Sequence, residues 1–195
     1  MNKGDYLTSI LRSSKTVFST KDISMLWHDP SSTASRVRLS YYAKKGDLYR
    51  IRKGLYAKDR HYNRLELATR IFTPSYVSFE TVLAKEGLIF QYYEEIFVAS
   101  YLNREISVDG QVYSFRKLKT SLLVNAVGVQ HVDETSIASR ERAFLDTLYA
   151  NKDYHFDNLG GLGWDFVFAI LPAYGNKRLE RLVNRMYKSQ DQESV

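Results

Sequence analysis

Residues 19–58 constrain the fold more than any other part of the chain. They open with a helix signal, because Thr20 is a residue type that caps helices. Pro30 ends that helix, since proline has no amide hydrogen and disfavours helical geometry in the residue before it. Further capping residues follow at positions 31–33, and the next helix is predicted to stop at Gly46. The predicted order is helix, tight turn, helix.

A β-hairpin is predicted directly after the second helix. Residues 48–51 and 55–57 have strand character, and residues 52–54 form the turn between them. Gly54 supplies the positive φ that a short hairpin loop needs. Residues 16–18 are expected to add a further strand to the same sheet. A helix-turn-helix followed by a hairpin with a basic tip is typical of a winged helix-turn-helix domain.

Positive charge is concentrated in this part of the chain. Residues 30–60 contain nine Lys or Arg and two Asp, a net charge of +7. Residues 1–72 hold 15 basic and 6 acidic residues, whereas residues 73–195 hold 13 and 16, within an overall charge of +6. Because the charge coincides with the helix-turn-helix and hairpin, we predict that this half binds double-stranded DNA. The second half is expected to have another task.

The helical register predicts which side chains of the second helix face away from the core. At about 100° per residue, one face is formed by Ser35, Leu39, Tyr42 and Ala43, and this face is predicted to be buried. A competing register would bury Ala34, Val37 and Tyr41 and would leave Leu39 in water. In the preferred register, the predicted DNA-binding residues of the helix and hairpin are Thr33, Arg36, Arg38, Ser40, Tyr41, Lys44, Arg50, Arg52 and Lys53.

The whole chain is predicted to belong to the α+β class, with a winged helix-turn-helix domain at residues 1–62 and a mixed α/β domain at residues 63–195. Besides the elements above, helices are expected at residues 5–12, 63–72, 78–85, from 139, and at 164–171 and 176–187, with a polar tail from 189. Strands are expected at residues 94–101, in a hairpin around Asp109-Gly110, and once or twice within 122–132. Three helices are predicted to be capped by Thr20, Ser78 and Ser139.

Several kinds of chemistry are disfavoured by the composition. The chain has no cysteine, which excludes disulfides, zinc ribbons and thiol catalysis. Its four histidines lack the spacing of metal ligands, and the glycine-rich residues 160–163 lack the Lys-Ser/Thr of a phosphate-binding loop. We therefore expect no metal, no cofactor and no enzymatic activity. The polar N-terminal residues and the absence of a long apolar run predict a cytoplasmic protein with no membrane partner.

Three stretches of the sequence carry a resemblance to a known family. They are YAKKGDLYRIRKGLYA at residues 42–57, YVSFETVLAKEGLI at 76–89 and SIASRERAFLDTLY at 136–149. Together they resemble the AbiEi-type antitoxins of bacterial abortive-infection toxin–antitoxin operons. The resemblance covers about residues 16–150, and the Phe-Leu-Asp core of the third stretch is residues 144–146.

The resemblance implies a function for each half of the chain. The N-terminal winged helix would bind inverted repeats in the promoter of its own operon and repress it. The C-terminal domain would neutralise a nucleotidyltransferase-like toxin encoded next to it, which provides resistance to phage. Whether neutralisation involves direct contact with the toxin is left open, and the resemblance assigns no residues to it.

Two other classes of protein stay open at this point. One is a stand-alone winged-helix transcriptional regulator whose second half binds a ligand or a protein. The other is a nucleic-acid-modifying enzyme, which the lack of paired carboxylates or a histidine cluster argues against. A second basic surface, for a protein or RNA partner, is conceivable at Arg140, Arg142, Arg178, Arg181 and Arg185.

Overall fold

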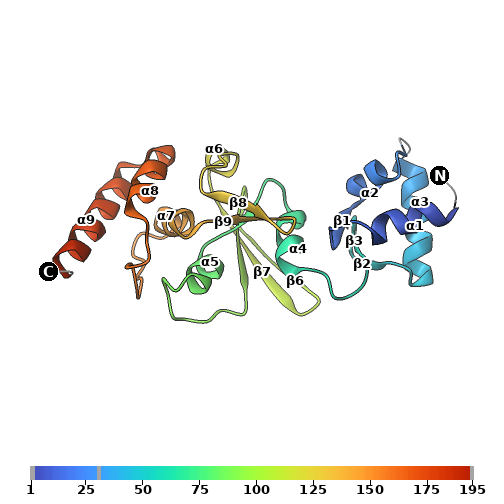
Figure 1. The fold of residues 1–195 in the computed structure, drawn as a ribbon, viewed down its shortest axis with the longest axis horizontal. Helices are drawn as coiled ribbons and strands as arrows, with labels where there is room; N and C mark the ends of the chain where they lie inside the picture. Colours follow the sequence, from blue (N-terminus) through green and yellow to red (C-terminus); the bar gives the residue numbers. More distant parts are fainter. Residues whose placement is uncertain (1–2, 30–31, 194–195) are drawn as a thin grey trace. The chain divides into compact units, whose positions relative to one another are not determined.

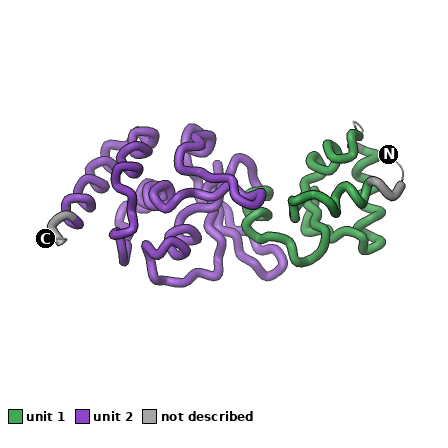
Figure 2. Tube along the Cα trace, in the orientation of Figure 1, with its two compact units in different colours: residues 1–71 green, residues 72–195 purple. Residues whose placement is uncertain are grey.

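The computed structural model describes residues 3–29 and 32–193 and shows a mixed α+β protein with two β-sheets (Figure 1). The chain divides into two compact units, Met1–Ile71 and Phe72–Val195 (Figure 2). The division falls after residue 71 rather than at the expected residue 62. The helix between these positions belongs to the first unit, because Glu66 accepts hydrogen bonds from the Thr16 amide and hydroxyl at 2.8 and 2.6 Å.

The first unit combines helices with a small antiparallel sheet. Its elements are α1 (Lys3–Leu11), β1 (Val17–Ser19), α2 (Thr20–Leu26), α3 (Ser32–Lys45), β2 (Tyr49–Arg52), β3 (Leu55–Ala57) and α4 (Arg64–Ile71). The strand order is β1-β3-β2, so the predicted extra strand is confirmed and pairs with β3 from Val17↔Ala57 to Ser19↔Leu55. The core cluster is formed by Ile10, Phe18, Ile23, Trp27, Leu39, Tyr42, Leu48 and Tyr56.

Helix α2 is capped by Ser19, so the prediction of Thr20 as the cap is wrong by one residue. The Ser19 hydroxyl accepts from the Asp22 amide at 3.1 Å, and an Asp22 carboxylate oxygen accepts from the Ser19 amide at 2.9 Å. This reciprocal pair is a capping box. Thr20 instead donates from its amide to the carbonyl of Gly54 at 3.1 Å, which ties the hairpin loop to the start of α2.

Helix α2 is ended by residues 28 and 29, which precede Pro30. His28 has a φ of 49°, its amide donates to the Met25 carbonyl at 3.2 Å, and the Asp29 amide donates to the Ser24 carbonyl at 3.1 Å. These two bonds form a Schellman motif, in which a left-handed residue ends the helix. Pro30 and Ser31, at which the sequence predicted the break and a cap, lie outside the described residues.

The second unit is built around a six-stranded sheet. Its strands are β4 (Tyr76–Val77), β5 (Ile96–Ser100), β6 (Arg104–Val108), β7 (Gln111–Lys117), β8 (Val129–Val132) and β9 (Thr135–Ala138), in the order β6-β7-β5-β4-β9-β8. The β5–β7 and β4–β9 pairs are parallel, and the other neighbours are antiparallel. The remaining elements are α5 (Glu80–Lys85), α6 (Thr120–Leu123), α7 (Arg140–Ala150), α8 (Trp164–Ile170), the 3₁₀ helix η1 (Leu171–Tyr174) and α9 (Lys177–Glu193).

The sequence predictions for this unit have mixed outcomes. The Asp109-Gly110 hairpin is confirmed, since both residues have positive φ, and all of β5 is buried. Residues 120–123 form a helix, so residues 122–132 contain one strand, β8. The prediction of a tail from residue 189 is wrong, because α9 continues to Glu193. No helix in the described ranges is both long enough and apolar enough to cross a membrane.

A buried polar network joins α7 to the sheet of the second unit. Arg142 and Asp146 are both fully buried, with 3.4 Å between Arg142 Nε and an Asp146 carboxylate oxygen. The hydroxyls of Tyr76, Ser78 and Tyr174 donate to the Asp146 carboxylate at 2.9, 2.8 and 2.6 Å. Burial raises the pKa of Asp146. Arg142 and the three hydroxyls favour the carboxylate and lower this pKa, but the effect of burial is larger.

This network corrects two predictions made from the sequence. Ser78 is not a helix cap, because its hydroxyl donates to Asp146 and α5 begins after Phe79 without a side-chain cap. Ser139 does cap α7, as predicted, by accepting from the Arg142 amide at 3.2 Å. Arg142 is excluded from any basic surface, since its guanidinium is buried and donates to the carbonyls of Leu122 and Val127.

Candidate nucleic-acid interface

Helix α3 lies on the core of the first unit in the register that the sequence favoured. Ser35 and Leu39 are fully buried, whereas Val37 is 67% exposed and Tyr41 is 59% exposed. These burials exclude the competing register, in which Val37 and Tyr41 would be inside. The face of α3 that carries Ser40, Tyr41 and Lys44 is therefore open to solvent.

Asp29 fixes α3 from the preceding turn and engages one of the predicted DNA-binding residues. The Ser35 hydroxyl donates to an Asp29 carboxylate oxygen at 3.0 Å, and Arg38 reaches the same oxygen at 3.3 Å. The Arg38 guanidinium also lies 3.9 Å from the centre of the Tyr6 ring, in cation–π geometry. Arg38 therefore holds α3 to α1 and to the turn, and its charge is partly satisfied within the unit.

The other eight predicted residues are exposed, on α3 and on the hairpin formed by β2 and β3. They are Thr33, Arg36, Ser40, Tyr41, Lys44, Arg50, Arg52 and Lys53. Within the described part of the chain, none of the five basic residues in this set forms an ion pair. Lys45 differs, because its ammonium pairs with Asp47 at 3.0 Å, and this contact raises the pKa of Lys45.

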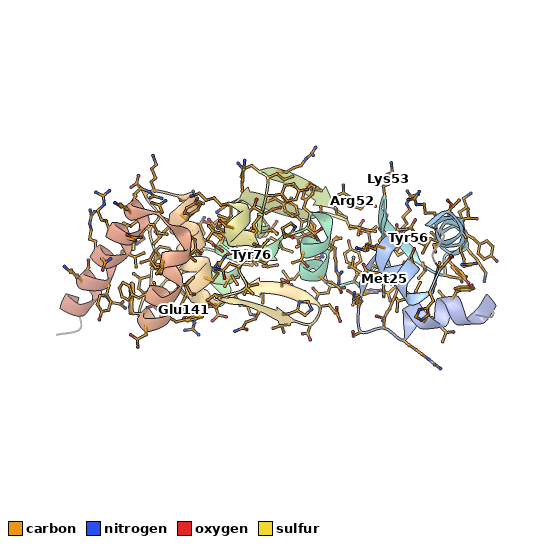
Figure 3. The ribbon with its side chains drawn as sticks, turned by 90° about the horizontal axis from the view of Figure 1, so that it is seen from above. Met25, Arg52, Lys53, Tyr56, Tyr76 and Glu141 are labelled. Atoms are coloured by element: carbon orange, nitrogen blue, oxygen red, sulfur yellow. The ribbon has the colours of Figure 1, made fainter. Side chains whose placement is uncertain are left out.

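The hairpin presents its basic residues because of its register and its turn. Arg50 pairs with Tyr56 and Arg52 with Leu55, and the shift between them marks a β-bulge. Gly54 has a φ of 83°, as the predicted turn required. Lys53 extends outward from the end of the hairpin, next to Arg52 (Figure 3). The bulge and the turn together place three cations on one short element.

Most acidic groups of the first unit are used internally, which leaves the exposed cations uncompensated. Asp22 pairs with Lys15 at 3.0 Å and with Arg70 at 3.4 Å. Burial of Asp22 would raise its pKa, but the hydrogen bonds from Ser19 and Lys15 outweigh burial, and the pKa is lowered. Asp29 and Asp47 also have basic partners, so these carboxylates do not neutralise the exposed cations of α3 and the hairpin.

Val37 is a member of this surface that the predicted residue set did not include. It lies on the exposed face of α3 between Thr33 and Tyr41, with 67% of its surface accessible. The available signal was an apolar residue on a polar helix face, and such a residue can make apolar contact with a thymine methyl group.

A metal site receives no support from the geometry. The described residues contain no group of three or more His, Asp or Glu side chains that could hold a metal ion. Comparison with models of known protein families finds no match, and comparison with curated proteins finds none either. The surface formed by α3 and the hairpin is therefore identified from its geometry and charge, and not from a related protein.

Proposed function

We propose that the first unit is a winged helix-turn-helix that binds double-stranded DNA. The observation that carries this proposal is the exposed, unpaired set of cations on α3 and the β2–β3 hairpin. The order of α2, a tight turn, α3 and a hairpin supports it, because a helix of this length fits the major groove and a hairpin can reach the adjoining backbone. Ser40, Tyr41 and Lys44 would meet base edges, Val37 a thymine methyl, and Arg50, Arg52 and Lys53 phosphates.

The proposal extends to the whole chain through the resemblance to AbiEi-type antitoxins. The first unit would bind inverted repeats in its own promoter and repress the operon, and the second would neutralise a nucleotidyltransferase-like toxin. In this role the chain is a cytoplasmic, non-enzymatic protein of phage resistance. Support comes from the second and third resembling stretches, which meet in one buried network. Tyr76 and Ser78 belong to the stretch at residues 76–89, and their partners Arg142 and Asp146 belong to the stretch at 136–149. The resemblance thus coincides with residues that hold the second unit together.

Binding to promoter DNA tests the first part of the proposal. Fluorescence anisotropy would compare a duplex from the upstream region with a scrambled duplex over a range of salt concentrations. Combining Arg52→Ala and Lys53→Ala should lower the slope of log K against log[salt] by about 0.9 for each lost phosphate contact. Arg12→Ala removes a charge outside α3 and the hairpin and should leave the slope unchanged. An unchanged slope in the double variant would exclude the hairpin from the interface.

Specificity tests the position of α3. Ser40→Ala and Tyr41→Ala should each cost about 1–3 kcal/mol of binding free energy on the promoter duplex and little on the scrambled one. The melting temperature should not change for the exposed Ser40 and should fall only slightly for Tyr41→Ala, which loses an edge-on contact with the Tyr42 ring at 5.6 Å. Equal losses on both duplexes would mean that α3 does not read base edges.

A ligand-responsive regulator is the second candidate, favoured by a groove in the second unit. The groove has a volume of about 740 Å³ and is lined by residues 154–160 together with Met186, Ser189 and Gln190. This volume is within the range of small-molecule sites. A stand-alone regulator would repress its promoter but would not restore growth to cells that express the neighbouring toxin.

A further inference from the structure

Helix α9 carries a row of basic side chains in a unit that is otherwise acidic. The row consists of Lys177, Arg181, Arg185 and Lys188, which follow one another at spacings of four, four and three residues. Such spacing places side chains on one face of a helix, and all four are exposed. We call this set the α9 basic row.

Positive charge in the second unit is concentrated in the first twelve residues of α9, whereas the last five, residues 189–193, add two acidic residues and no basic one. Residues 177–188 hold five basic residues and one acidic residue, whereas the rest of residues 73–195 holds 8 basic and 15 acidic residues. In the described ranges, no member of the α9 basic row forms an ion pair. Arg178 differs, because its guanidinium donates to the carbonyls of Leu148 and Tyr149 at the end of α7.

The apolar face of α9 is already occupied within the unit. Leu179 and Val183 are fully buried, and Tyr187 packs against Trp164 with 5.2 Å between ring centres. The helix therefore has no free apolar face to insert into a lipid surface. Tyr187 is 36% exposed, but its ring packs against Trp164 and Phe168 and is therefore not a free anchor of the kind on which protein interfaces depend.

We propose that the α9 basic row binds the phosphodiester backbone of a nucleic-acid duplex. The row extends along about 17 Å of helix, and a duplex carries about ten phosphate charges over that length. Contacts to phosphate oxygens give affinity without sequence preference, because the backbone is the same at every base pair. This site lies in the second unit and does not rest on the function proposed for the first unit.

The test measures salt-dependent binding of the full chain to random-sequence duplexes of DNA and of RNA. The background carries Arg36→Ala, Arg52→Ala and Lys53→Ala, which removes cations of α3 and the hairpin. In that background, Lys177→Ala, Arg181→Ala, Arg185→Ala and Lys188→Ala are combined. Because alanine favours helix, α9 should be kept, and circular dichroism and the melting temperature verify this. Should that variant not melt cooperatively, Arg185→Gln with Lys188→Gln replaces it.

A matched control removes the same charge from the same unit at other exposed positions. It combines Lys85→Ala, Arg104→Ala, Lys117→Ala and Lys152→Ala, all exposed in the structure. The α9 variant should lower the slope of log K against log[salt] by about 2–4, because each phosphate contact contributes about 0.9. The control should leave the slope unchanged. Arg181→Lys with Arg185→Lys should also retain binding, because a phosphate contact needs a charge.

Each outcome decides the proposal. A lower slope in the α9 variant alone supports it, and the comparison of DNA with RNA identifies the nucleic acid. Equal slopes in the α9 variant and the control overturn it, as does complete loss of binding in the background variant. If the background changes nothing while the α9 variant loses binding, the α9 proposal stands and the DNA-binding role of the first unit is wrong.

Discussion

Arg36 and Arg38 lie two positions apart on α3, yet their surroundings assign them different roles. Arg36 is exposed and has no ion-pair partner among the described residues, whereas Arg38 contacts Asp29 and the Tyr6 ring. Arg36→Ala should therefore weaken DNA binding and leave the melting temperature unchanged. Arg38→Ala should lower the free energy of unfolding by about 1 kcal/mol, because it removes a mostly buried ion pair and a cation–π contact.

Thermal melting and duplex binding of the two variants check this assignment. Asp29→Ala is the matched control, because it removes the partner of Arg38 without removing a cation from the surface. It should destabilise the protein at least as much as Arg38→Ala does, because the buried Ser35 hydroxyl also loses its acceptor. If Arg38→Ala melts like the parent protein and loses salt dependence as strongly as Arg36→Ala, Arg38 belongs to the DNA surface, as the sequence predicted.

Arg142 offers a second prediction at the level of single residues. Its guanidinium pairs with Asp146 and donates to two carbonyls in a fully buried position. Arg142→Ala leaves the Asp146 carboxylate buried without its cation, which should cost about 3–5 kcal/mol of unfolding free energy. Arg140→Ala is the control on the same helix. It breaks a partly exposed ion pair with Glu86 and an exposed hydrogen bond to the Gly161 carbonyl, and should cost about 1–2 kcal/mol. Comparable losses in chemical denaturation would contradict this account.

The sequence could not have predicted the buried network. From the sequence alone, Arg142 is expected at the surface, because a charged residue on an amphipathic helix is normally solvated. Its partners Tyr76 and Tyr174 are 66 and 32 residues away along the chain, and only the fold brings them together. Ser78 is likewise predicted as a cap because capping is a local signal, whereas its actual acceptor, Asp146, is 68 residues away along the chain.

At the level of elements, local signals predicted the first unit well. The register of α3 is confirmed because Ser35, Leu39 and Tyr42 repeat at helical spacing, and a stripe of this kind must face the core. The two hairpin turns could be predicted because glycine and Asp-Gly are residue types that tolerate positive φ. The structure shows positive φ at Gly54, Asp109 and Gly110. Failures occurred where apolar runs are short. Residues 120–123 form a single helical turn, which periodicity cannot distinguish from a strand.

The capping box of α2 makes the stability of the first unit dependent on pH. The pKa of Asp22 is lowered from its ordinary value of 3.8, so the carboxylate is favoured by folding. Its contribution to the free energy of unfolding is complete above that value and is lost as the pH falls through the lower folded pKa. Asp22→Asn should therefore destabilise the unit at neutral pH and reduce the loss of stability on acidification.

Tryptophan fluorescence gives the measurement for the first unit alone. Trp27 lies in its core, and Trp164→Phe removes the other tryptophan of the chain. Unfolding by urea would be followed between about pH 2 and pH 7 in this background, because the loss occurs below the ordinary Asp22 pKa of 3.8. Asp59→Asn, at an exposed position, serves as the control and should leave the pH dependence unchanged. A pH dependence that is identical with and without Asp22 would disprove its assigned contribution.

At the level of the whole molecule, α4 determines where the chain can be divided. The sequence suggested residue 62, because charge and predicted element type change near there. In the structure, Glu66 and Arg70 of α4 bond to Thr16 and Asp22 in the first unit. A fragment of residues 1–71 should therefore fold and bind promoter DNA. A fragment of residues 1–62 should melt at a lower temperature, because the Thr16 amide and hydroxyl lose their acceptor.

The antitoxin proposal makes a separate prediction for the second unit. A fragment of residues 72–195 should restore growth to cells that express the neighbouring toxin, and it should not bind the promoter duplex specifically. Weak, sequence-independent binding through the α9 basic row is compatible with this result. The fragment contains the complete Arg142–Asp146 network, so circular dichroism and cooperative melting should show that it folds.

Full-length protein with Arg52→Ala and Lys53→Ala separates protection from repression in the same growth assay. If the second unit acts on the toxin or its effects, this variant should protect cells although it no longer represses the promoter. Protection by both the folded fragment and the variant would support the division of labour between the two units. If neither protects, while the unaltered chain does, protection depends on DNA binding. The protein would then be a transcriptional repressor, and the antitoxin proposal would be wrong.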